Sequence, residues 1–286
     1  MAVKPTLYFA HANGFPGGSY RTFLAPLAEY YDVRVLDRAG HDPAWPVDAN
    51  WHSLSLQLEA ELEACPRPLI GVGHSLGAVL MFMVASRRPE WFRSLVMLDP
   101  PLINGWQGAL FNLARLFGQV DRVSPAGLSL GRRDYWPDLD SAREYFGRRG
   151  FFASLDPRCL QDYMQAGLEP VPDEHGASGS RESAQGWRLR FRPEVEVAIF
   201  RTTPGNIGRY PPIKVPSLMI SGSDSPAMFR IAASRHVRRH NMLWWDAPGE
   251  HMFPLQNPEG TARLLIRGLQ ALEKDALEKG EDRASA

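Results

Sequence analysis

The sequence predicts an α/β fold in which a doubly wound, mostly parallel sheet carries a helical insertion. Two observations support this prediction. Strand-like and helix-like segments alternate over the first hundred residues, and the alternation breaks at about residue 102 and resumes near residue 215. Repeated β–α units form mostly parallel sheets that are buried on both faces, and 286 residues suffice for one such domain with an insertion.

The first part of the chain contains four strand-like segments separated by helical patterns. The expected strands are TLYFAHA (6–12), DVRVLD (32–37), PLIGVGH (68–74) and SLVMLD (94–99). The expected helices cover residues 20–31, 51–65 and 75–88. In the second of these helices, Leu54, Leu58 and Leu62 recur at helical spacing, which indicates one buried face.

The rest of the chain divides into an insertion and the second part of the core. Residues 102–210 are rich in aromatic side chains but show little strand alternation, which predicts a helical cap over the sheet. After the cap we expect strands over 215–222 and 241–247, and helices near 226–239 and 258–274. The predicted organisation is a core of residues 1–101 and 211–286 with a cap of residues 102–210.

Composition and charge argue against several classes of protein. Lys+Arg and Asp+Glu both number 32, so the net charge of zero argues against a dedicated nucleic-acid binder. The longest continuous apolar run, residues 78–85, is too short to cross a bilayer, and residues 1–11 lack the features of a signal peptide. Cys65 and Cys159 have no metal-type spacing. We expect a cytoplasmic protein with free thiols, no membrane or nucleic-acid partner, and an undetermined oligomeric state.

The segment GHSLG places Ser75 between Gly73 and Gly77, at the junction of a predicted strand and a predicted helix. A serine at the tip of such a sharp turn has strained backbone angles, so the residues two positions away must be small. The turn exposes the hydroxyl at the carboxyl edge of the sheet, where open α/β sheets bind ligands. The helix N-terminus also lies under any negative charge that develops there. The motif therefore predicts a nucleophilic serine.

Two other interpretations of this segment are weaker. A random chain of this length contains G-x-S-x-G about one time in ten, but the strand–turn–helix setting favours function. The segment also approximates a dinucleotide-binding G-x-G-x-x-G pattern, with Asp99 at the end of the next strand. Its spacing is one residue too long, and it does not belong to the first β–α–β unit.

A serine nucleophile needs a base and donors for the oxyanion. His251 follows the last predicted strand, late in the chain, which matches the Ser…Asp…His order of this type of site. The turn HANGFPGG (11–18) follows the first strand and can direct a backbone N–H at the reacting oxygen, together with the N–H of Leu76. His236 and His240 lie four residues apart without a third ligand, so we expect them to face solvent and to bind no metal.

HANGFPG, GHSLGA, SGSD and GEHMFP, in this order, resemble the α/β-hydrolase superfamily, and specifically its members with a helical cap. The resemblance implies a triad with Ser75 as nucleophile and His251 as base. It also implies an oxyanion hole formed by the N–H of Leu76 and of a turn residue. Aligning NGFPG on the family's HGFPG makes that residue Phe15.

Two carboxylates end predicted strands between the serine and the histidine. The usual acid of this superfamily follows the later strand, so we expect Asp224, in SGSD, to orient His251. Asp99 is the alternative, although an Asp before Pro often initiates a turn.

These expectations define a metal-free serine hydrolase with no cofactor. It is expected to cleave a small or medium carboxylic ester through an acyl-enzyme, as a carboxylesterase does. The aromatic cap suggests an apolar acyl or alcohol group. The alternatives are a thioesterase, lactonase or C–C bond hydrolase with the same triad, or a non-catalytic ligand-binding protein of the same fold.

Overall fold

The computed structural model describes residues 3–103, 126–172 and 186–284, together with residues 113, 119 and 121. Six strands form one sheet in the order β2-β1-β3-β4-β8-β9, and all neighbouring strands are parallel. The strands are β1 (Thr6–Ala10), β2 (Asp32–Val35), β3 (Leu69–His74), β4 (Phe92–Leu98), β8 (Ser217–Gly222) and β9 (Leu243–Ala247). The predicted doubly wound sheet is confirmed. Its strand order reverses between β1 and β3, and open α/β sheets bind ligands at such a point.

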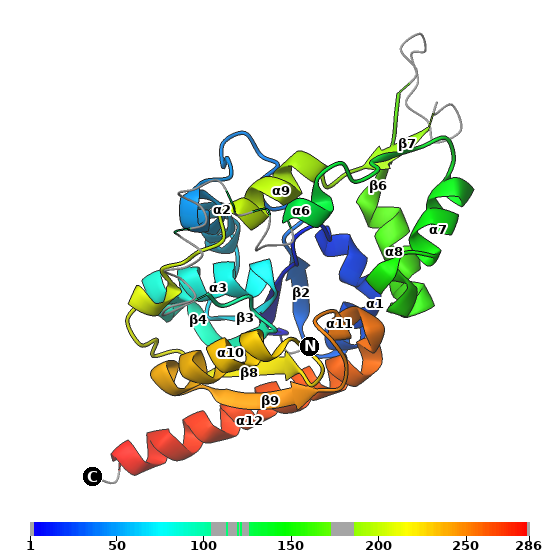
Figure 1. The fold of residues 1–286 in the computed structure, drawn as a ribbon. Helices are drawn as coiled ribbons and strands as arrows, with labels where there is room; N and C mark the ends of the chain where they lie inside the picture. Colours follow the sequence, from blue (N-terminus) through cyan, green and yellow to red (C-terminus); the bar gives the residue numbers. More distant parts are fainter. Residues whose placement is uncertain are drawn as a thin grey trace.

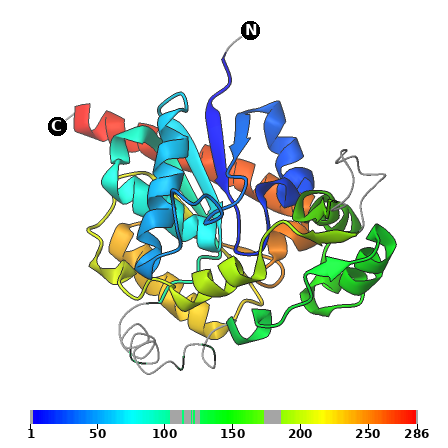
Figure 2. The same cartoon turned by 90° about the horizontal axis from the view of Figure 1, so that it is seen from above.

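Helices cover both faces of the sheet (Figures 1 and 2). One face packs against α1 (Arg21–Leu24) and α12 (Pro258–Ala284), and the other packs against α2 (His52–Glu63), α3 (Leu76–Arg87) and α10 (Ala227–His240). Alternate residues of one strand therefore enter different cores: Leu7 and Phe9 enter the first, whereas Tyr8 enters the second. The predicted buried face of α2 is confirmed, because Leu54, Leu58 and Leu62 are fully buried.

Between β4 and β8 the chain forms four described helices and a second, smaller sheet. The helices are α6 (Ala126–Ser129), α7 (Leu139–Gly147), α8 (Pro157–Gly167) and α9 (Pro193–Arg201). The antiparallel sheet contains β5 (Tyr135–Trp136), β6 (Leu168–Pro170) and β7 (Trp187–Leu189) in the order β5-β7-β6. Two or three residues are too few to show strand alternation, which explains why the sequence predicted only helices. Residues 104–112 and 173–185 of the predicted cap lie outside the described residues.

The remaining helical elements of the described residues are short. They are α11 (Phe253–Gln256) and the 3-10 turns Gly17–Tyr20, Ala25–Glu29, Ala49–Trp51, Pro89–Trp91, Gly150–Ser154 and Ile207–Arg209. Cys65 and Cys159 are buried and free, as expected. Within the described part of the chain, no helix combines the length and the hydropathy that crossing a membrane requires.

His236 and His240 are buried on α10, which corrects the expectation that they face solvent. Their rings lie 4.2 Å apart and pack against Phe82 at 4.6 and 4.9 Å. The Nε2 atom of each has no hydrogen-bond partner among the described residues. Burial lowers the pKa of His236 to about 3 and that of His240 to about 4, because the charged ring would lose its hydration.

We expect these histidines to make folding sensitive to acid. Their pKa values in the folded protein lie below the unfolded value of about 6.5, so the unfolded chain binds more protons as the pH falls below 6.5. Stability is therefore complete above pH 6.5 and is lost towards pH 4, by about 1.4 kcal/mol per pH unit for each histidine. Urea unfolding at pH 7 and pH 5 measures this loss. For His236→Phe we expect it to be about 2 kcal/mol smaller than for the wild type; an equal loss would contradict the assignment.

Candidate active site

Ser75 occupies a sharp turn between β3 and α3, with φ 52° and ψ −116°. A Cβ atom at Gly73 would overlap the backbone of Gly77 and Ala78, and one at Gly77 would overlap the backbone of Ala10. The two glycines are thus required by close backbone contacts around the turn, as the motif predicts. The N–H of Gly77 also donates to the carbonyl of His11 (3.1 Å), which joins this turn to the one after β1.

Ser75, His251 and Asp99 form a continuous line of hydrogen bonds. The Oγ of Ser75 lies 3.0 Å from Nε2 of His251, and Nδ1 of His251 lies 2.7 Å from Oδ2 of Asp99. Because an ionised carboxylate only accepts hydrogen bonds, Nδ1 carries the proton and Nε2 faces the serine as an acceptor. The three residues come from the turn after β3, the loop between β9 and α11, and the residue after β4. The carboxylate is buried, with 3% of its side chain exposed.

Asp99 is held in place by a second group of donors. Its backbone has φ 41°, a strained value for a residue other than glycine. Oδ1 accepts a hydrogen bond from the N–H of Gly222 (3.3 Å), and Oδ2 accepts a second one from the hydroxyl of Ser225 (2.8 Å). With His251, these donors satisfy a carboxylate that would be costly to bury alone.

The expected contact between Asp224 and His251 is wrong. Asp224 lies in the turn after β8, where its N–H donates to the carbonyl of Gly249 (3.0 Å) and its side chain is exposed. Its neighbours Gly222 and Ser225, in the same turn, contact Asp99 instead. The turn therefore supports the acid from its two ends, while the side chain of Asp224 points to solvent. The alternative acid that the sequence allowed, Asp99, is the one beside the histidine.

The turn after β1 also differs from the expectation at Phe15. The N–H of Phe15 donates to the carbonyl of Ala12 (3.1 Å), so it closes the turn and is not free for an oxyanion. HANGF contains two residues more than the family's HGF, and Gly14 bends the longer turn with a φ of 80°. In the described part of the chain, the backbone N–H groups of Asn13 and Leu76 have no acceptor.

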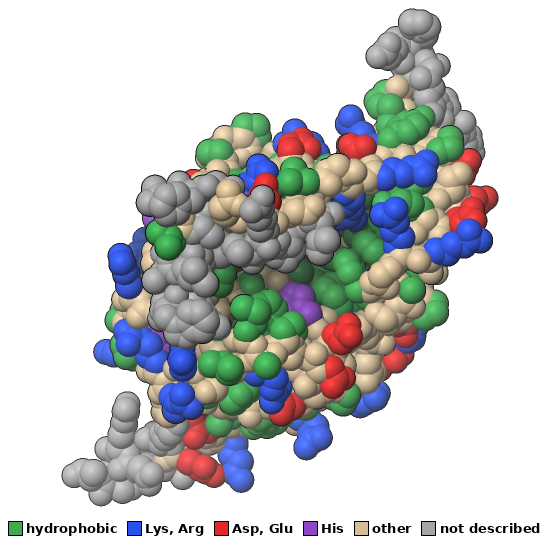
Figure 3. All heavy atoms as spheres, in the orientation of Figure 1, with side chains coloured by type: hydrophobic (Ala, Val, Ile, Leu, Met, Phe, Trp, Pro, Cys, Tyr) green, Lys and Arg blue, Asp and Glu red, His purple; other side chains and the backbone are tan. Residues whose placement is uncertain are grey.

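Aromatic side chains from the segment between β4 and β8 surround this turn. The ring of Phe15 packs against Phe151, Phe152 and Tyr163, with centroids 5.0 to 5.8 Å apart. At the start of α10, the ring of Phe229 lies 5.9 Å from that of His251. Figure 3 shows a histidine side chain at the base of a hollow that is lined largely by hydrophobic side chains. The surroundings of the triad are therefore mostly apolar.

One buried ion pair interrupts these apolar surroundings. Arg132 contacts Glu196 at 2.8 Å and also donates to the hydroxyl of Tyr163 (2.8 Å). Glu196 additionally accepts from the hydroxyl of Ser129, and its carboxylate lies beside Gly14. The charges of this pair compensate each other, so it presents no uncompensated charge to a ligand.

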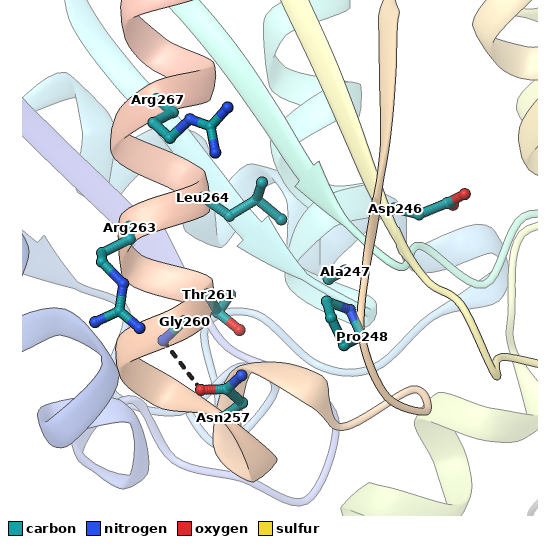
Figure 4. Close-up of a pocket in the computed structure, with 9 residues that line it drawn as sticks. All are labelled: Asp246, Ala247, Pro248, Asn257, Gly260, Thr261, Arg263, Leu264 and Arg267. Carbon is teal, nitrogen blue, oxygen red and sulfur yellow. Dashed lines mark hydrogen bonds between the residues drawn. The ribbon is translucent and has the colours of Figure 1, made fainter.

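A separate pocket of about 340 Å³ opens beside the start of α12 (Figure 4). Its lining residues are Asp246, Ala247, Pro248, Asn257, Gly260, Thr261, Arg263, Leu264 and Arg267. None of the triad residues lines it, so it is not the candidate reaction site. Across the described residues, no three His, Cys, Asp or Glu side chains are grouped to hold a metal ion.

Two buried residues next to the triad were not singled out in the sequence. His74 precedes Ser75 in GHSLG and is fully buried, as is Tyr20. A histidine at the end of an otherwise apolar strand is a signal that could have been noticed. Tyr20 has no such signal, because it lies in a helical pattern of ordinary composition.

The chain belongs to the alpha/beta hydrolase family, whose model matches residues 7–264. Among curated proteins, it is similar to a type I acyl-CoA thioesterase of Penicillium roqueforti (28% identity; 58% of this chain and 40% of that protein). It is also similar to the pimeloyl-[acyl-carrier protein] methyl ester esterase of Methylococcus capsulatus (35% identity; 36% of this chain and 42% of that protein). The matched region thus spans less than half of each of these relatives.

Solved structures share the fold at low sequence identity. E-2-(acetamidomethylene)succinate hydrolase matches with a TM-score of 0.70 and 18% identity, covering 94% of this chain and 92% of that one. The thioesterase domain of the curacin biosynthetic pathway matches with a TM-score of 0.64 and 19% identity, covering 92% and 91%. At these identities the likeness establishes the fold alone.

Proposed function

We propose that this member of the family is a serine hydrolase that cleaves esters or thioesters of an apolar acyl group. The observation that carries the proposal is the line of hydrogen bonds from Ser75 through His251 to Asp99, at 3.0 and 2.7 Å. A hydroxyl, an imidazole and a buried carboxylate in this order are the parts that nucleophilic acyl transfer needs.

In the proposed reaction, the hydroxyl of Ser75 attacks the acyl carbon and His251 takes its proton. The N–H groups of Leu76 and Asn13 donate to the oxyanion, and Asn13 replaces Phe15 in this role because the N–H of Phe15 is already used. His251 then protonates the leaving alcohol or thiol. Water deacylates Ser75 by the reverse sequence of proton transfers, and the products are a carboxylic acid and an alcohol or thiol.

The apolar surroundings of the triad support an apolar acyl group. The aromatic side chains around Phe15 belong to the segment that we propose to be a cap, residues 102–210. They can bury an acyl chain but offer it no uncompensated charge, since Arg132 is paired with Glu196. A carboxylic ester is our first candidate. A thioester is the second, because similar proteins include a named acyl-CoA thioesterase as well as a named methyl ester esterase.

A matched pair of substrate series separates these candidates. p-Nitrophenyl esters and coenzyme A thioesters of acetate, butyrate and octanoate are assayed with the purified protein. We expect hydrolysis that becomes more efficient with the longer acyl chains, in at least one series, and the series with the higher kcat/KM identifies the leaving group. The absence of turnover in both series, with no reaction with a fluorophosphonate, would instead favour a non-catalytic binding protein.

A further inference from the structure

His74 connects the candidate base to a second buried side chain. Its Nε2 lies 2.9 Å from the backbone carbonyl oxygen of His251, and its Nδ1 lies 2.7 Å from the hydroxyl of Tyr20. The same hydroxyl lies 3.3 Å from the backbone N–H of Ala12, in the turn after β1. Tyr20 and His74 are both fully buried, so water does not compete for these hydrogen bonds.

The chemistry of the partners fixes the direction of each hydrogen bond. A carbonyl only accepts, so Nε2 of His74 carries the proton and donates to His251. Nδ1 of the neutral ring is then an acceptor, and the hydroxyl of Tyr20 donates to it. The oxygen of that hydroxyl accepts from the N–H of Ala12. Burial lowers the pKa of His74 to about 3, which keeps the ring neutral in this single tautomer at ordinary pH.

We propose that Tyr20 and His74 are positioning residues: together they form a hydrogen-bond relay that fixes the loop of His251 relative to the turn after β1. The relay rests on the proposed function, because its role is to keep Nε2 of His251 at 3.0 Å from Ser75. It joins three segments that are remote in the sequence, namely the turn after β1, the turn before α3 and the loop after β9.

Two features favour positioning over packing alone. The bonded carbonyl belongs to His251 itself, so a displacement of that peptide moves the imidazole. Apolar side chains could fill the same volume, whereas a buried polar pair is costly unless every partner is satisfied. A displacement of about 1 Å in a reacting group can reduce a rate by about a hundredfold. Loss of the relay is therefore expected to lower kcat and to leave KM nearly unchanged.

The variant Tyr20→Phe removes one hydroxyl and retains the ring, which packs against Phe9 with centroids 4.7 Å apart. The matched control is Tyr8→Phe. Tyr8 is also buried, and its hydroxyl contacts Glu61 at 3.3 Å in the core on the other face of the sheet. We expect Tyr20→Phe to lower kcat about tenfold to a hundredfold, with KM changed less than about threefold, whereas Tyr8→Phe keeps the kcat of the wild type.

Two variants of His74, of which only one retains a hydrogen-bond donor, provide a second comparison. His74→Gln retains an N–H that can donate to the carbonyl of His251, whereas His74→Leu cannot donate. We expect His74→Gln to keep a higher kcat than His74→Leu. Equal kcat values for these two folded variants would show that the donor to His251 has no positioning role.

Nitrogen-15 NMR of the wild-type protein tests the relay without turnover and without a mutation that could impair folding. We expect His74 to be the Nε2–H tautomer and to remain neutral from pH 5 to 8. Protonation of His74 in this range, or the Nδ1–H tautomer, would overturn the relay. An inactive wild type would contradict the proposed function, whereas an active wild type with equal kcat for Tyr20→Phe and Tyr8→Phe would overturn the relay alone.

Discussion

Asp99→Asn is expected to lower kcat by at least about a hundredfold, whereas Asp224→Asn is expected to change it by less than about twofold. The carboxylate of Asp99 accepts the Nδ1–H of His251 at 2.7 Å and stabilises the imidazolium that forms when Ser75 loses its proton. Asparagine has nearly the same shape, but it lacks the charge and can present an N–H to the ring. That N–H favours the tautomer in which Nε2 carries the proton and cannot act as the base.

The measurement is kcat and KM for both purified variants, with folding checked by circular dichroism. KM of Asp99→Asn should change little, because the imidazolium forms on the way to the transition state. Asp224 is the matched control, because it is also an aspartate that follows a central strand, but its side chain is exposed. A folded Asp99→Asn protein with near-normal kcat, or a strong loss confined to Asp224→Asn, would contradict the assignment.

Ser75→Ala is expected to abolish turnover, with a loss of about 10⁴-fold or more in kcat, because the nucleophile itself is removed. The fold should be retained. The hydroxyl of Ser75 forms a hydrogen bond with His251, and alanine keeps the Cβ atom and hence the same backbone constraints at φ 52°.

The control for this variant is Ser86→Ala. Ser86 lies on α3, the helix that follows Ser75, and its hydroxyl donates to the carbonyl of Phe82 within the helix, away from the triad. We expect its kcat to equal that of the wild type. Thermal unfolding of both variants checks that any loss of turnover is not a loss of folded protein. Substantial turnover by folded Ser75→Ala protein would show that another residue performs the attack.

The sheet could be predicted because its strands and helices alternate clearly in the sequence. Ser75 could be predicted because its flanking glycines are local requirements of a sharp turn: a Cβ at Gly77 would overlap the backbone of Ala10. His251 could be predicted from its place after the last strand. Each of these features follows from the local sequence or from the order of segments along the chain, so the sequence pattern contains it.

The acid could not be chosen from the sequence, since both candidates follow strands between Ser75 and His251. Sheet order and side-chain direction decide the choice. β4 pairs directly with β3, and the positive φ of Asp99 turns its carboxylate towards the histidine. The turn that contains Asp224 directs Gly222 and Ser225 towards Asp99 instead. Neither a positive φ at a residue before proline nor the direction of a turn is visible in a linear pattern.

The prediction that Phe15 donates to the oxyanion was wrong for a related reason. The alignment of NGFPG on HGFPG assumed that equivalent letters occupy equivalent positions, whereas this chain has two more residues between the histidine and the glycine, and Phe15 falls at the end of the turn. The N–H of Phe15 therefore donates to the carbonyl of Ala12. The relay through Tyr20 and His74 was also not predictable, because it depends on contacts between segments 54 and 177 residues apart.

The most direct test of the central claim, that Ser75 is a nucleophile activated by His251, is peptide mass spectrometry after reaction with a fluorophosphonate. The account predicts one adduct per chain, on the peptide that contains Ser75. It also predicts no adduct on Ser75→Ala and a much slower reaction for His251→Ala, because the hydroxyl then lacks its base. An active wild-type protein that carries its adduct on another residue, or that remains unmodified, would contradict the account.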